Sequence, residues 1–217
     1  MARRTIESWR LFWVLAIAIS TAICLGLPYA DFHTARGTEF IILHSVLCAL
    51  PCLLIAFTAS SLATLWPSRS TRWLLANRRY FGLAFASGMS WHFAFVGYYL
   101  IFFGNPINNR DLTLDLIGLC FLLAMTLTSF RRFARRLNLA DWRCLHKMGI
   151  YTLWFLPTFF YVNDLRNNWD PFLFGVLIVL FATLILRGIA WAKKSVLPKQ
   201  ISWRSSKKAG VLSSPKS

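Results

Sequence analysis

The chain has 217 residues, of which 57% are hydrophobic, 16% aromatic and 15% charged, and its formal net charge is +16. The hydrophobic residues stand in long uncharged runs, which excludes an ordinary soluble domain and predicts a polytopic membrane protein in a lipid bilayer. The basic residues lie between these runs rather than over one folded surface, so we expect no nucleic-acid partner.

Six runs are long enough to cross a bilayer, whose core needs about 20 apolar residues in helical form. They lie at about 11–30, 40–66, 80–103, 112–130, 144–162 and 171–191. The sequence therefore predicts an all-α integral membrane protein, with a six-transmembrane-helix bundle over residues 1–192 and a basic, disordered tail over 193–217. We expect the first run to remain as a helix, because Pro28 stands where a signal cleavage site needs a small residue.

The distribution of charge predicts the orientation. If the N-terminus is cytoplasmic, every Lys and Arg except Arg36, Arg110 and Arg166 falls on the inner side. This is the bias that the positive-inside rule describes. An even number of spans then places both termini in the cytoplasm.

Two histidines stand inside the second and third runs, where a polar ring is costly unless it is paired or ligated. His44 lies near the outer end of its run, and His92 lies near the middle of the bilayer. At 100° per residue, Gly88 lies within about 40° of the His92 face, one turn below it. A gap at Gly88 would admit the edge of a flat ligand; close helix packing at this glycine is the simpler alternative.

The segment 126–162 reads TLTSFRRFARRLNLADWRCLHKMGIYTLWFLPTFFYV and joins the fourth run to the fifth through a strongly basic loop. His146 stands where the fifth run begins, and Gly149 is expected to open space beside it. The third and fifth runs have the same direction, so Arg78 and His146 should lie at similar depth near the inner surface, with His92 about four helical turns further out. Arg78 also fits a plain topology charge at the headgroups.

Three segments together carry a family resemblance: RRYFGL followed by His92, TLTSFRRFARRLN, and W-R-C-L-H leading to Pro157. Over about residues 40–190 the chain resembles the ferric reductase-like transmembrane domain family. The resemblance implies one or two b-type haems between the third and fifth spans, with His92 and His146 as iron ligands and Arg78 beside the inner haem.

The same resemblance implies a partner on each side of a bacterial inner membrane. Electrons would pass from a cytoplasmic flavin reductase, with an FMN at the cytoplasmic face, to an acceptor outside. That acceptor would be a periplasmic redox subunit or another membrane subunit. The chain would then be the electron-transfer subunit of an oxidoreductase rather than a complete enzyme.

One position departs from the family pattern, because Phe159 stands where a further histidine ligand is expected. His44 is then the remaining buried candidate to pair with His92, although it should lie about 10 Å nearer the outer surface. Two hypotheses follow: a haem-bearing transmembrane electron carrier, or a haem-free relative that acts as a structural or assembly subunit of a larger membrane complex. Copurification of haem distinguishes them.

Overall fold

The computed structural model describes residues 2–104, 108–167 and 169–212, with side chains within 9–104, 108–167 and 169–195. Over these residues the protein is all-helical and forms no strand. In chain order the elements are α1 (Ala2–Gly26), the 3-10 turn η1 (Leu27–Tyr29), α2 (Ala35–Leu65), α3 (Arg69–Phe103), α4 (Asn109–Thr128), the one-turn α5 (Arg131–Ala134), α6 (Leu139–Asn167) and α7 (Pro171–Leu212).

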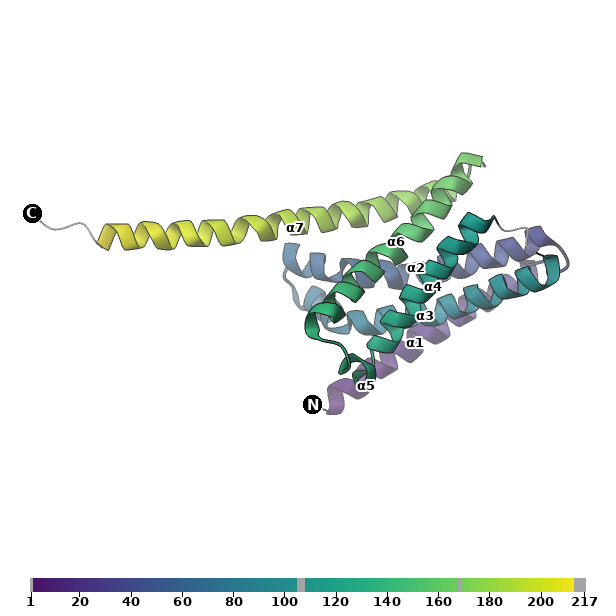
Figure 1. The fold of residues 1–217 in the computed structure, drawn as a ribbon, viewed down its shortest axis with the longest axis horizontal. Coiled ribbons are helices and arrows are strands. Elements are labelled where there is room, and N and C mark those ends of the chain that lie inside the picture. The colour runs from purple at the N-terminus through teal and green to yellow at the C-terminus, as the bar shows by residue number, and fades with distance from the viewer. Residues whose placement is uncertain (1, 105–107, 168, 213–217) are drawn as a thin grey trace, which may run out of the picture.

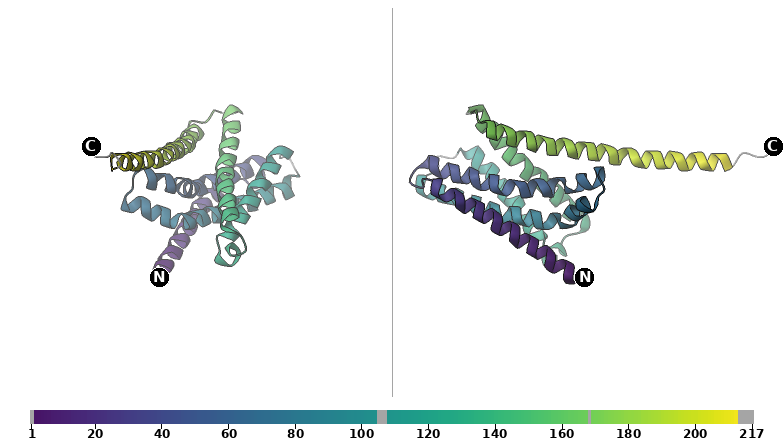
Figure 2. Two further views of the ribbon diagram at one scale, coloured as in Figure 1. Left: turned by 60° about the vertical axis from the view of Figure 1, so that its left-hand side comes forward. Right: turned by 180° about the vertical axis from the view of Figure 1, so that it is seen from behind.

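The long helices alternate in direction within one bundle (Figure 1). Helices α1, α3 and α6 run one way and α2, α4 and α7 the other, so α1 begins and α7 ends toward the same end of the bundle (Figure 2). Helix α3 packs against both α1 and α2, α4 packs against α6, and α7 packs against α2 and α6. The basic one-turn helix α5 lies at the end where α1 begins.

Four helical segments of the described residues are long and apolar enough to cross a membrane: Trp9–Tyr29, Ala35–Leu65, Asn109–Thr128 and Pro171–Ser195. Large apolar side chains on their outer faces are exposed, as bilayer contact requires. The chain is therefore a multi-pass membrane protein. The other two predicted runs form α3 and α6, which are long but richer in Tyr, Trp, Ser, Gly and charged residues.

These two less apolar helices carry the polar groups of interest, His92 and His146. Helix α3 tolerates such groups because α1 and α2 cover it, and many of its side chains are buried. An ionisable residue in a membrane protein is much less costly when it faces the bundle interior.

Helix α7 differs from the sequence prediction in length. It continues as a helix to Leu212, beyond residue 193, where we predicted a disordered tail to begin. Residues 189–197, IAWAKKSVL, contain neither Gly nor Pro, so nothing in this stretch ends the helix. The last residues, 213–217, lie outside the described part of the chain.

Gly88 is a point of direct contact between α3 and its two neighbours. A Cβ atom on Gly88 would lie 2.7 Å from the Cβ of Ala49 and 2.9 Å from Cγ2 of Ile19. Of the two alternatives drawn from the sequence, close helix packing at Gly88 is therefore confirmed, and a gap for a flat ligand is wrong. The glycine instead lets α3 approach α1 and α2 closely, as small residues do in membrane bundles.

We expect Gly88→Ala to lower the free energy of unfolding by about 1–2 kcal/mol, because the added methyl group overpacks this contact. Gly97→Ala on the same helix is the matched control, since a Cβ there would meet no described atom within 4 Å. Unfolding of both variants in mixed detergent micelles measures the difference. Equal stabilities would contradict the packing role of Gly88.

Candidate functional site

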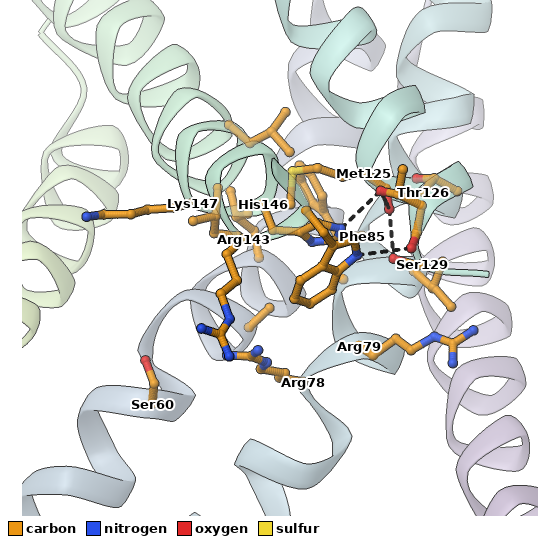
Figure 3. Close-up of a pocket in the computed structure, with 18 of the residues that line it drawn as sticks. Ser60, Arg78, Arg79, Phe85, Met125, Thr126, Ser129, Arg143, His146 and Lys147 are labelled. Carbon is orange, nitrogen blue, oxygen red and sulfur yellow. Dashed lines mark hydrogen bonds between the residues drawn. The ribbon is translucent and has the colours of Figure 1, made fainter. Parts of the chain in front are cut away.

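A cavity of about 530 Å³ lies between α2, α3, α4 and α6, with α5 and Arg187 of α7 at its margin (Figure 3). Sites for small molecules and cofactors usually measure about 300–1,000 Å³. One part of the wall is apolar and includes Leu53, Leu83, Phe85, Leu122 and Leu153. The cavity therefore has both the size and the apolar wall of a cofactor site.

The rest of the wall is strongly basic. Its cationic residues are Arg78, Arg79, Arg131, Arg143, Lys147 and Arg187. No Asp or Glu among the described residues lines the cavity, and the salt bridge found in the described part of the chain, Arg110–Asp111, lies elsewhere. Like charges gathered without an acidic partner favour an anionic ligand between them.

The guanidinium groups of Arg78 and Arg143 point toward one another in Figure 3. They come from α3 and α6, the two helices between which the family resemblance implies a cofactor. Arg79 lies to the side, over the rings of Trp9, Tyr80 and Phe130, at 5.7 to 6.0 Å from their centroids. Arg78 and Arg143 are therefore the pair best placed to bind the acidic groups of one ligand.

His146 is half-buried on the wall of the same cavity and is held by α4. Its Nε2 lies 3.0 Å from Oγ1 of Thr128. The Thr128 hydroxyl donates its proton to the Ala124 carbonyl at 2.6 Å, so the imidazole Nε2–H is the donor to Thr128. This arrangement leaves Nδ1 of His146 as the nitrogen with a free lone pair.

Trp142 fixes the His146 ring from one helical turn away. The two ring centroids lie 4.3 Å apart, and the indole Nε1–H donates to the Thr128 carbonyl at 3.2 Å. Trp142 and His146 of α6 thus both form hydrogen bonds to Thr128, at the end of α4. The sequence reasoning missed Thr128, although it lies in the TLTSF segment that was singled out.

The structure brings Arg78 and His146 together in one cavity, as their positions in two parallel helices predict. It does not support the predicted role of Gly149. A Cβ on Gly149 would clash with Met125 and approach Phe121, so this glycine permits close packing of α6 on α4 rather than opening space. The glycine that leaves space is Gly82, which lines the cavity and whose added Cβ would meet no described atom within 4 Å.

His92 lies at a different and much smaller cavity. Its ring is 7% exposed, and its Nδ1–H donates to the Ile42 carbonyl at 3.4 Å. The adjoining cavity measures about 60 Å³, far below the roughly 300 Å³ at which cofactor sites begin. The residues around His92 therefore do not fit a haem in this structure.

His44 does not pair with His92. Its Nε2–H donates to the Ala22 carbonyl of α1 at 3.1 Å, and Cys48 Sγ lies 3.5 Å from the same nitrogen. The ring occupies the space left by Gly26, where an added Cβ would lie 2.6 Å from Nε2. The predicted His44–His92 pair is wrong because the His44 ring faces α1, whereas His92 contacts α2 and a cavity toward α4 and α6.

These features define an all-helical, multi-pass membrane protein with a basic, histidine-containing cavity near one end of the bundle. Comparison of the chain with family models, with curated proteins and with solved structures finds no match. Among the described residues, no group of three or more His, Cys, Asp or Glu side chains is placed to hold a metal ion.

Proposed function

We propose that this chain is a transmembrane electron carrier of the ferric reductase-like type, with one b-type haem in the basic cavity. In this proposal α1, α2, α3, α4, α6 and α7 are six spans, and both termini lie in the cytoplasm of a bacterial cell. The supporting observation is the combination within one 530 Å³ cavity of an imidazole, an apolar wall and convergent guanidinium groups. A haem is a flat apolar ring with two carboxylates and an iron that accepts imidazole, so it matches all three.

The residues of the cavity have separate roles in this proposal. His146 would hold the iron through Nδ1, because Nε2–H is donated to Thr128. Arg78 and Arg143 would bind the carboxylates, and the apolar wall would exclude water. The bound haem would supply one-electron redox chemistry within the bilayer.

The donor would be a cytoplasmic flavin reductase, and its FMN phosphate would meet the basic α5 segment. Four arginines of that segment are exposed: Arg131, Arg132, Arg135 and Arg136. Exposed guanidinium groups bind phosphate and attract acidic protein surfaces. The acceptor would be a subunit on the outer side of the inner membrane.

The experiment that tests the proposal is a reduced-minus-oxidised optical spectrum of the purified protein, with a pyridine haemochrome assay for the number of haems per chain. We expect a b-type signal and a ratio close to one. A folded, colourless protein would overturn the proposal.

A haem-free structural or assembly subunit is the second candidate. Two observations favour it: Phe159 replaces the further ligand that the family resemblance leads us to expect, and the His92 cavity is too small for a haem. In that case the basic cavity would bind another anionic ligand or partner. The same spectrum distinguishes the two functions.

The hydrogen bond from His146 to Thr128 gives a further prediction. We expect Thr128→Val, which keeps the side-chain shape, to weaken haem binding about tenfold, because partners that orient a metal-ligating histidine typically contribute 10–100-fold in affinity. Haem titration of the apoprotein, followed by absorbance, measures the change. Thr113→Val is the control, since Thr113 bonds its own helix near the other end of α4, and an equal loss there would contradict the role of Thr128.

A further inference from the structure

The small cavity beside His92 has a second ionisable residue on its wall, Asp115 of α4. The other lining residues, from α2, α3, α4 and α6, are all uncharged and apolar. A volume of about 60 Å³ is enough for water, which needs roughly 10–15 Å³ of such space per molecule. An imidazole and a carboxylate thus share a water-sized space with otherwise apolar walls.

The hydrogen bonding of His92 leaves one nitrogen for this cavity. Nδ1 is engaged with the Ile42 carbonyl of α2. In the neutral ring Nε2 is then the acceptor, and it forms no hydrogen bond within the described residues. A water molecule in the cavity would donate to it.

Asp115 lies on the cavity wall in the second turn of α4, toward the end of the bundle where α4 begins. It is half-buried and lies one helical turn from Asp111, which is near the start of α4 and pairs with Arg110 at 3.2 Å. Two acidic residues spaced by one turn thus lie between the start of α4 and the other α4 residues of the cavity wall, Gly118 and Leu122. In the orientation proposed above, this end faces outward.

The other ionisable groups nearby face away from the cavity or are already hydrogen-bonded to another residue. Glu39 of α2 accepts the Tyr99 hydroxyl at 2.7 Å, and the His44 ring faces α1. Helix α6 contributes four apolar residues to the cavity wall. Among the described residues, Asp115 is therefore the acidic group that shares the cavity with His92.

We propose that His92 and Asp115 form a proton-binding site, joined through water in this cavity and reached from the end of the bundle where α4 begins. A proton from the aqueous phase adds to Nε2 of His92, and no other bond is made or broken. The Asp115 carboxylate balances the charge of the imidazolium, which in a membrane interior is costly without a partner. The inference does not rest on haem binding.

Nuclear magnetic resonance of protein labelled with ¹⁵N-histidine, in lipid nanodiscs and over a range of pH, tests the proposal. The His92→Gln variant assigns the His92 signal among the four histidines. We expect His92 to become protonated as the pH falls, with a midpoint that moves at least about 1 pH unit lower in Asp115→Asn, since a nearby opposite charge typically contributes about 1–3 units. Asp164→Asn is the matched control, because Asp164 lies on α6 and does not line the cavity.

An unchanged His92 midpoint in Asp115→Asn would overturn the proposal, as would a His92 ring that stays neutral until the protein unfolds. A His92 signal shifted by bound haem would also overturn it and would place a haem at this level. The titration of His92 can be measured whether or not the preparation contains haem. Failure of the electron-carrier proposal is detected by the optical spectrum, and failure of the proton-site proposal by the His92 titration.

Discussion

Replacement of His146 by alanine is expected to abolish haem binding, whereas replacement of His92 by alanine is expected to leave about one haem per chain. The two histidines differ in the space beside them. His146 lines a cavity of about 530 Å³ with six basic residues, and His92 adjoins one of about 60 Å³. A cofactor of haem size has room at the first position and not at the second.

The pyridine haemochrome ratio of purified wild type, His146→Ala and His92→Ala measures this difference. Circular dichroism and size-exclusion chromatography of each variant show whether it is folded. Equal loss of haem in two folded variants, or two haems in the wild type, would contradict the assignment of a single haem to the His146 cavity.

The helical architecture could be predicted from the sequence because each membrane helix is recognised from its own apolar run, without knowledge of its neighbours. Long apolar runs set the positions of the helices, and short loops make neighbouring helices antiparallel. The shared depth of Arg78 and His146 follows from the same reasoning: both stand near the beginning of helices that run in one direction, and the rise per residue is fixed. Because they lie at similar depth on neighbouring helices, both residues line the same cavity.

The directions of individual side chains around each helix could not be predicted in the same way. A helical wheel shows which residues share a face, but it does not show which neighbour that face contacts. Gly149 was expected to leave space, yet it contacts Met125, and the wheel left Gly88 open between a gap and the close packing on Ala49 that the structure shows. His44 was the remaining candidate to pair with His92, but its ring occupies the space left by Gly26 on α1.

Contacts between distant parts of the chain were also missed. Arg187 reads in the sequence as one more basic residue near the end of the last run. In the structure its NH1 donates to the Phe57 carbonyl at 2.7 Å and its Nε donates to the Tyr151 hydroxyl at 2.9 Å. The guanidinium carbon also lies 4.4 Å and 4.7 Å from the centroids of these two aromatic rings. Arg187 thereby joins α7 to both α2 and α6.

Replacement of Arg187 by methionine is therefore expected to destabilise the bundle by about 2–3 kcal/mol. A hydrogen bond from a charged group contributes about 1.5–3 kcal/mol and a cation–π contact about 0.5–2 kcal/mol, and partial exposure of this side chain reduces their sum. Methionine keeps most of the apolar stem, so the loss reports on the guanidinium group. Unfolding by sodium dodecyl sulfate in mixed micelles measures the change in free energy.

Lys193→Met is the matched control on the same helix. Lys193 also reaches carbonyls of α2, those of Thr64 and Leu65, but at 3.4 and 3.3 Å and from an exposed position. An exposed substitution of this kind usually changes stability by no more than about 0.5 kcal/mol. If both variants unfold alike, the attachment of α7 depends on its apolar face and not on Arg187. If Arg187→Met alone is weakened, a single arginine in the last predicted span holds α7 against α2 and α6, the helices that flank the basic cavity.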